Sequence, residues 1–220
     1  EKEQLFLSER AVFDGSLPIR GGVPVCFPQF AALGGLPKHG LVRTRSWQLR
    51  DQSSHGGCTL VSLACGDDAA SRAVWPHAFA AEVTVAIEGE RLDIELSVIN
   101  PGETPFAFTG ALHTYLRVAE VEEVSLEGLY GLDYRDALRG DAIVRESAPS
   151  LVVEREVDRV YHDCARPLLL RDAERTLGIN AEGFADTVVW NPWEGAPERF
   201  PDLGPKDFRR ILCVEAAVAH

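Results

Sequence analysis

Short segments of alternating apolar and polar residues, separated by turn residues, constrain the fold of this chain most. Residues 79–87 read FAAEVTVAI, residues 91–99 read RLDIELSVI, and EGE lies across the turn. A period of two places one row of side chains against a core and the other toward solvent, as in a β-strand. The pair predicts a β-hairpin, and the turn NPGE then leads to a third strand, PFAFTGALHTYLRV.

The same pattern recurs along the rest of the chain. Further strands are predicted at residues 58–64, 121–127, 142–144, 157–161, 168–172, 176–180, 187–191 and 211–217. Few windows keep a helical period, and PKDFRR is expected to form one helical turn. The charged stretch 144–157 suits a loop or sheet edge. Many short strands at close spacing predict an all-β sandwich or barrel, in one domain spanning residues 1–220.

Composition narrows the possible partners and compartments. The formal net charge of -12 argues against general nucleic-acid or anionic-membrane surfaces, and no apolar run is long enough to cross a membrane. The five cysteines form no CxxC pair, so we expect buried free thiols in a reducing cytoplasm. The chain contains no methionine, and we expect it to be part of a longer protein.

His113 is a candidate functional residue because of its place in ALHTYLRV. Alternation puts His113, Tyr115 and Arg117 on one face, and three polar-tipped side chains on an apolar strand indicate a lined cavity. A structural histidine with satisfied hydrogen bonds is the alternative.

Glu215 is a second candidate, within the apolar run ILCVEAAV. It shares a face with Ile211 and Cys213, where a carboxylate is costly unless it is paired or protonated. Such a group has a perturbed pKa and suits general base catalysis. The alternative is a solvent-facing residue on an edge strand.

Residues 21–50 gather positive charge on an otherwise acidic chain, in a stretch rich in glycine and proline. The basic residues in and beside this segment are Arg20, Lys38, His39, Arg43, Arg45 and Arg50. Forked arginine donors suit a phosphate or a polyhydroxyl ligand. A solvated loop that pairs with acidic surface is the alternative, and it is the preferred interpretation for Arg45 and Arg50.

Other motifs are less specific. The indoles of Trp190 and Trp193 in WNPWEG could stack on a sugar or anchor a sandwich, and the second interpretation is preferred. Asp158 and Asp133 are candidate hydroxyl acceptors or ordinary turn residues. The six histidines show no HxH or HExxH spacing, so no metal site is expected. No GxGxxG, P-loop or GxSxG motif occurs, and no nucleotide cofactor is expected.

Six motifs follow one another in a specific order: IRGGVPVCFPQF, LPKHGLVR, ALHTYLRV, EVDRVY, VVWNPW and LCVEAAV. Together they resemble the aldose 1-epimerase (galactose mutarotase-like) superfamily, and within it the D-hexose-6-phosphate mutarotases, from about residue 7 to residue 218. The resemblance implies a large antiparallel β-sandwich with a shallow groove and no cofactor. The implied partner is a small phosphosugar. We also expect a monomer that binds neither nucleic acid nor membrane.

The resemblance also implies roles for single residues. His113 corresponds to the catalytic acid of the family and Glu215 to its catalytic base. The implied substrate-binding residues are Arg20, Lys38, His39, Arg43 and Asp158. Lys38 stands where the PQHG motif of the family has a glutamine, and VEAA replaces VEPG. A cation at Lys38 suits a phosphate or a different sugar. The family usually has further strands at both ends.

The expected reaction is interconversion of the α and β anomers of a hexose 6-phosphate, glucose 6-phosphate above all. Glu215 would take the proton of the C1 hydroxyl, and His113, as imidazolium, would protonate the ring oxygen. The open aldehyde would rotate and reclose, while the basic loop anchors the phosphate. The alternatives are a non-catalytic carbohydrate-binding β-sandwich and a phosphosugar sensor without turnover.

Overall fold

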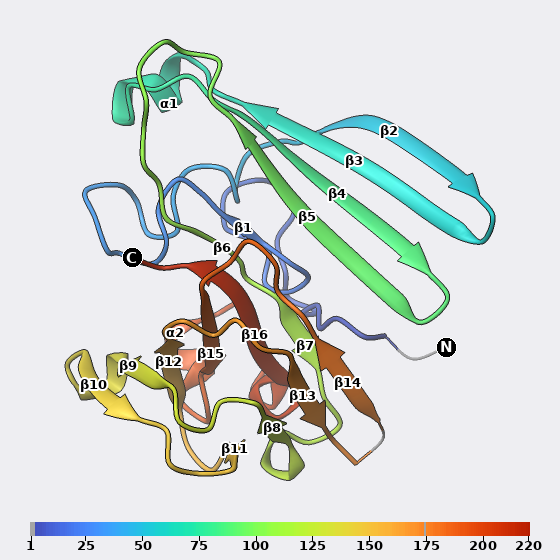
Figure 1. Ribbon diagram of the computed structural model, residues 1–220, viewed down its shortest axis with the longest axis vertical. Coiled ribbons are helices and arrows are strands. Elements are labelled where there is room, and N and C mark those ends of the chain that lie inside the picture. Colours follow the sequence, from blue (N-terminus) through green and yellow to red (C-terminus); the bar gives the residue numbers. More distant parts are fainter. Residues whose placement is uncertain (1–2, 174) are drawn as a thin grey trace.

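The hairpin predicted from residues 79–99 is present as β4 (Ala80–Glu88) and β5 (Arg91–Ile99) in the computed structural model, which describes residues 3–173 and 175–220. Two preceding strands, β2 (Gln48–His55) and β3 (Cys58–Gly66), extend it to an antiparallel sheet in the order β2-β3-β4-β5. This sheet forms the upper right of the molecule in Figure 1. Helix α1 (Ala69–Val74) connects β3 to β4 and begins with a capping box.

The largest sheet carries the strands that form the site. Its order is β1-β6-β16-β15-β12-β9-β10, with β7 also paired to β16, and all its strand pairs are antiparallel. The strands are β1 (Val25–Cys26), β6 (Gly110–Leu112), β7 (Tyr115–Arg117), β9 (Asp133–Asp136), β10 (Ala142–Arg145), β12 (Val157–Tyr161), β15 (Asp186–Asn191) and β16 (Ile211–Val218).

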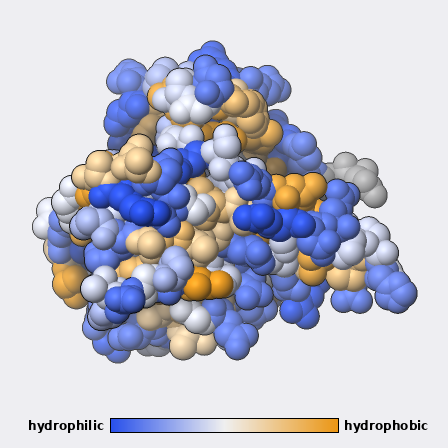
Figure 2. All heavy atoms as spheres, turned by 90° about the horizontal axis from the view of Figure 1, so that it is seen from above, coloured by the Kyte–Doolittle hydropathy of each residue, from blue (hydrophilic) through white to orange (hydrophobic). Residues whose placement is uncertain are grey.

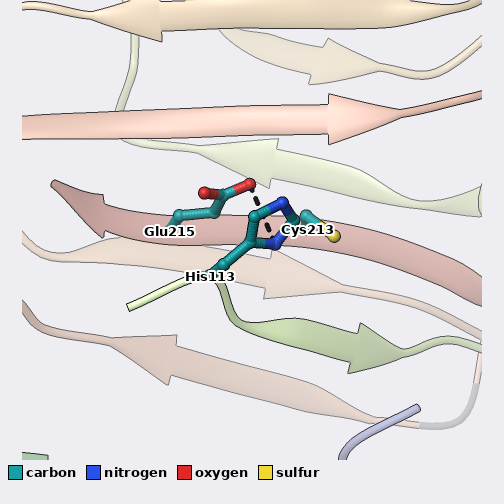
Figure 3. A group of neighbouring side chains, drawn as sticks. All are labelled: His113, Cys213 and Glu215. Atoms are coloured by element: carbon teal, nitrogen blue, oxygen red, sulfur yellow. Dashed lines mark ion pairs between the residues drawn. The ribbon is translucent and has the colours of Figure 1, made fainter. Parts of the chain in front are cut away.

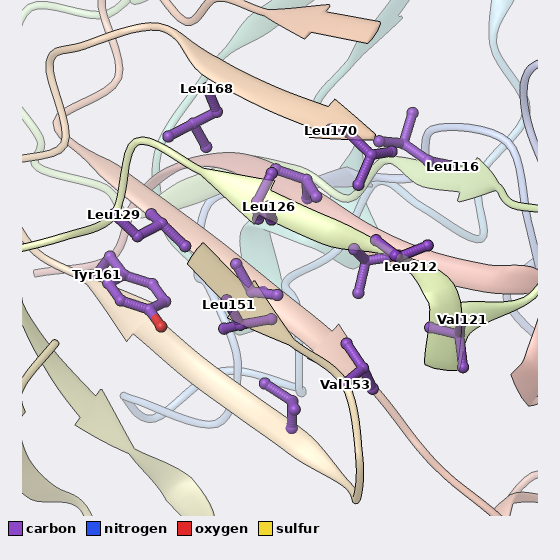
Figure 4. Close-up of a cluster of buried hydrophobic side chains, with 14 of the residues drawn as sticks. Leu116, Val121, Leu126, Leu129, Leu151, Val153, Tyr161, Leu168, Leu170 and Leu212 are labelled. Atoms are coloured by element: carbon purple, nitrogen blue, oxygen red, sulfur yellow. The ribbon is translucent and has the colours of Figure 1, made fainter. Parts of the chain in front are cut away.

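A third sheet covers one face of this sheet and encloses the main core. Its antiparallel order is β11 (Ser150–Val152), β8 (Ser125–Glu127), β13 (Leu168–Arg171) and β14 (Thr176–Ile179). Leu126 and Leu170 of this sheet pack with Leu212 and Val214 of β16 (Figure 4). Alternation along β16 therefore sends Glu215 to the opposite face, and a register slip by one residue would exchange the two faces.

The structure confirms the all-β sandwich and corrects several elements. The predicted strand PFAFTGALHTYLRV does not extend the hairpin. Only two short parts of it form strands, β6 and β7, and both pair with β16 instead. Residues 121–127 begin as a 3-10 turn (Val121–Glu123). The single turn predicted from PKDFRR is present as Asp207–Arg210, and the other short helices are Ala137–Arg139 and α2 (Ala196–Arg199). Strands β1, β2, β9 and β11 were not predicted.

The face of the molecule shown in Figure 2 is mostly polar. Figure 2 shows hydrophilic residues over most of one face, with smaller hydrophobic areas between them. Among the described residues, no helix has the length and apolar character needed to cross a membrane. Four of the five cysteines are buried, Cys58 is half-buried, and all are free thiols, as expected from the sequence.

Candidate active site

His113 and Glu215, far apart in the sequence, meet on the face of β16 that points away from the main core. Nδ1 of His113 lies 3.3 Å from Oε1 of Glu215, and the two side chains are only 11% and 2% exposed. Figure 3 shows the imidazole and the carboxyl facing each other, with Cys213 beside them. The pairing confirms that Glu215 is buried and excludes the solvent-facing alternative.

His113 owes its position to the break between β6 and β7. Its backbone N–H donates to the carbonyl of Pro24, and the N–H of Tyr115 donates to the carbonyl of Gly22. The segment before β1 therefore replaces a neighbouring strand and holds the break open toward Glu215. The ring of His113 stacks on that of Tyr115, with centroids 4.8 Å apart, which agrees with the predicted common face.

The strand register shows which other residues line the site. One row across the sheet contains Tyr115, Cys213, Trp190 and Asp158, on four neighbouring strands. Glu215 lies in the next row on that face, opposite Val188. Trp190 meets His113 edge to face at 6.0 Å, so this indole serves the site as well as the fold. Trp193 packs on Phe208 instead.

Burial perturbs both members of the pair. It lowers the pKa of His113 well below its ordinary value, with a further contribution from His39. It raises the pKa of Glu215 well above its ordinary value, and the negative charge of Asp158 acts in the same direction. Both shifts favour the uncharged forms of the pair, a neutral imidazole beside a protonated carboxyl.

Arg20 is held rigidly at the edge of this site. Its Nε donates to Oδ2 of Asp202 at 3.1 Å, and its Nη1 donates to the hydroxyl of Tyr115 at 3.0 Å. The guanidinium also lies over the ring of Phe200, 4.7 Å from its centroid. Forked donors fixed from three sides lose little entropy when they bind an anion.

His39 reaches the site from the basic segment, residues 21–50. Its surroundings fix its tautomer. The backbone N–H of Ala31 donates to Nδ1 at 3.3 Å, and Sγ of Cys26 lies 3.2 Å from the same atom. Burial, Arg43 and Lys38 lower the pKa of His39 to about 3, so the ring is neutral. Nδ1 is thus an acceptor and Nε2 carries the hydrogen, which makes Nε2 a hydrogen-bond donor. The ring centroids of His39 and His113 are 5.5 Å apart.

Gly40 allows this loop to approach β1 closely. It has φ +77, and a Cβ there would lie 2.1 Å from the carbonyl oxygen of Phe27, so any side chain forces the backbone apart. We expect Gly40→Ala to lower the free energy of unfolding by roughly 1–3 kcal/mol, measured by urea denaturation. Gly35→Ala is the matched control, because its Cβ would meet nothing within 4 Å. Equal losses in the two variants would contradict the explanation.

Lys38, Arg43 and Asp158 complete the set predicted from the sequence. Lys38 is exposed and Arg43 half-buried, and neither has a hydrogen bond or ion pair with the described part of the chain. Their positive charges both lower the pKa of His39. Burial raises the pKa of Asp158, and Lys38 opposes this shift. The structure therefore gathers all seven predicted residues around one site.

The sequence did not reveal some residues that hold the site side chains in place. It did predict that Arg45 pairs with the acidic surface rather than with a ligand. Asp202 and Cys26 orient Arg20 and His39, yet each lies in a loop or short strand without a recognisable pattern. Tyr115 was placed on the face of His113 but given no role. Arg45 pairs with the exposed Asp68 at 2.5 Å, which confirms the preferred surface interpretation.

Two groups of described residues bring three potential metal ligands within 4.8 Å of one another: His113, Cys213 and Glu215, and His162, Asp186 and His220. In the first group burial raises the pKa of the Cys213 thiol well above its ordinary value. The imidazole and the carboxyl of this group are in direct contact, an arrangement that suits proton transfer.

Comparison with known proteins places this site in a family context. The sequence profile of the family described as Aldose 1-epimerase matches residues 1–220. A protein from Cenchrus ciliaris named "Putative glucose-6-phosphate 1-epimerase" is 35% identical over all of this chain and 70% of its own length. A protein of the same name from Salmonella typhimurium is 30% identical over all of this chain and 74% of its length. A crystal structure described as that of a "putative mutarotase" from Salmonella typhimurium matches with a TM-score of 0.91. The two chains are 29% identical, and the match covers all of this chain and 74% of that one.

Proposed function

Since the chain belongs to the aldose 1-epimerase family, we propose that it interconverts the α and β anomers of a hexose 6-phosphate, with glucose 6-phosphate as the main substrate. The buried contact between His113 and Glu215 carries the proposal, because ring opening needs one acid and one base at a single centre. The free state of all five cysteines supports the cytoplasm as the compartment.

The reaction needs two proton transfers in each direction. Glu215, as carboxylate, takes the proton from the C1 hydroxyl, while His113, as imidazolium, delivers one to the ring oxygen. The C1–O5 bond breaks, the aldehyde rotates about C1–C2, and reclosure reverses both transfers. A proton held by Glu215 can pass to His113 across the 3.3 Å contact, and this transfer gives the carboxylate and the imidazolium together. Nε2 of His39 is available as a donor to a sugar oxygen.

The phosphate supplies a reason for that proton to move. Besides burial, the positive charges of Arg20 and Arg43 contribute to lowering the pKa of His113. A phosphate dianion bound between the two guanidiniums would neutralise this effect and raise the pKa of the imidazole again. Binding would thus orient the sugar and favour the imidazolium together.

The ionisation of His113 can be followed directly. We expect its ring to stay neutral as the pH falls through its ordinary value of 6.5, because burial lowers the pKa. Saturating inorganic phosphate should move that pKa upward. The measurement is a 15N NMR titration of the imidazole, with the signal assigned by its loss in His113→Asn. Titration at or above 6.5 in the free protein, or a downward shift with phosphate, would contradict the proposed linkage.

Saturation-transfer NMR of anomer exchange tests the function itself. The protein should speed exchange of glucose 6-phosphate well above the spontaneous rate, and it should speed exchange of free glucose much less. Comparable acceleration with free glucose would replace the proposal with an ordinary aldose mutarotase. Saturable binding without exchange would identify a phosphosugar-binding protein on an enzyme fold.

A further inference from the structure

A second cluster of ionisable side chains lies at the ends of three neighbouring strands, outside the proposed catalytic centre. His162 directly follows β12, Asp186 begins β15, and His220 lies two residues after β16. Nδ1 of His220 is 3.0 Å from Oδ2 of Asp186, and Nδ1 of His162 is 3.5 Å from Oδ1. The fold thus turns three residues that are distant in sequence toward one point.

The carboxylate of Asp186 at the centre of this cluster is incompletely satisfied. The residue is 1% exposed, and its Oδ2 accepts a hydrogen bond from the backbone N–H of Ala219 at 2.8 Å. Its Oδ1 is buried and accepts no hydrogen bond from the described residues. Nδ1 of His162 stands 3.5 Å from this oxygen, which is long for a hydrogen bond, so a cation held between them would satisfy the buried carboxylate better.

We propose that His162, Asp186 and His220 bind a divalent transition-metal ion, with Zn²⁺ as the best fit. Ligands at zinc bond lengths of about 2.05 Å are separated by about 3.3 Å in a tetrahedron. The two imidazoles contact different oxygens of Asp186, at 3.0 and 3.5 Å, and one ligand atom from each of the three residues lies within 4.8 Å of the other two. A small rotation of the side chains would bring the three atoms to that spacing. Two imidazoles and one carboxylate suit zinc, and water would take the fourth position.

Access and support also fit a metal site. The side chain of His220 is 63% exposed and that of His162 is 26% exposed, so an ion can enter from solvent. The backbone N–H of Ala219 orients the carboxylate from behind, as hydrogen bonds do for many metal-ligating groups.

The proposed ion would be structural rather than catalytic. Asp186 pairs with Ala217, and Val188 pairs with Glu215, so the cluster lies one row beyond Glu215, about 7 Å along the strands. Val188 and Ala217 belong to an apolar cluster that fills the space between. A metal would therefore fasten the ends of β12, β15 and β16, the strands that carry Asp158 and Glu215.

Isothermal titration of the metal-free protein with Zn²⁺ tests the proposal, with the visible absorbance of Co²⁺ as a second probe. We expect one equivalent to bind and to raise the melting temperature. His162→Ala and His220→Ala should each weaken binding at least tenfold. His55→Ala, on the exposed strand β2, is the matched control and should leave binding unchanged.

Two further variants separate this site from the proposed catalytic pair. Glu215→Gln should leave metal binding intact, whereas Asp186→Asn should abolish it. Circular dichroism of each variant reports whether the fold is retained, and the exposed His220→Ala keeps the test valid if Asp186→Asn does not fold. No binding at millimolar Zn²⁺, binding unaffected by both histidine variants, or binding lost with Glu215→Gln would overturn the proposal.

Discussion

Glu215→Gln is expected to reduce the catalysed exchange of glucose 6-phosphate anomers by about 10³-fold, without unfolding the protein. The amide cannot take a proton from the C1 hydroxyl, and general acid–base assistance is worth roughly 10²–10⁴-fold per group. Burial raises the pKa of the carboxyl and so favours its protonated, uncharged form. Glutamine has nearly the same shape and charge as that form, and the free energy of unfolding should change little.

The partner substitution His113→Asn should give a loss of similar size. The two residues act as one unit, so the double variant should be little slower than either single variant. Saturation-transfer NMR measures the exchange rate, and urea denaturation measures stability on the same samples. Trp193→Phe is a suitable control, because Trp193 packs on Phe208 rather than on the pair. Full activity in Glu215→Gln would exclude Glu215 as the base.

Local sequence patterns were sufficient to predict strands that have one clear apolar face. β12 lies at residues 157–161, as predicted, and the hairpin of β4 and β5 is within a residue of its predicted bounds. β2 could not be predicted in this way, because all of its residues are exposed and no apolar alternation marks it. Its order comes from pairing with β3, which is a tertiary effect.

The break at His113 could not be predicted from its own segment. ALHTYLRV alternates like a continuous strand, yet the backbone of His113 bonds to Pro24 rather than to a strand neighbour. This contact joins residues far apart in the sequence, and no local pattern carries it. Similarly, Glu215 was recognisable as an unusual carboxylate, but its partner became identifiable only through the resemblance and then through the register of β16.

The residues that hold the basic side chains in place could not be predicted from local sequence patterns either. Asp202 is separated from Arg20 by most of the chain, and Cys26 contacts His39 through a thiol that reads as an ordinary small apolar residue. Sequence reasoning identified which cations gather near the site. It could not distinguish Arg20, which is fixed by protein partners, from Arg43, which is not.

That distinction leads to the second large expected effect, for Arg43→Ala. Arg43 is half-buried beside Arg20 and His39, and among the described residues it has no hydrogen-bond or ion-pair partner. A guanidinium that stays charged without a protein partner is available for a phosphate. Hydrogen bonds to charged groups contribute about 1.5–3 kcal/mol, so KM for glucose 6-phosphate should rise roughly 10- to 100-fold. Exchange of free glucose should not change.

The comparison with Arg20→Ala makes this prediction specific. Removing Arg20 also leaves Asp202 and the hydroxyl of Tyr115 without their donor, so both KM and the free energy of unfolding should suffer. Arg43→Ala should affect KM alone, because it leaves no protein group unpaired. Arg45→Ala, which breaks only an ion pair with exposed Asp68, is the charge-matched control. If KM is unchanged in Arg43→Ala yet raised in Arg45→Ala, the phosphate binds outside the proposed site.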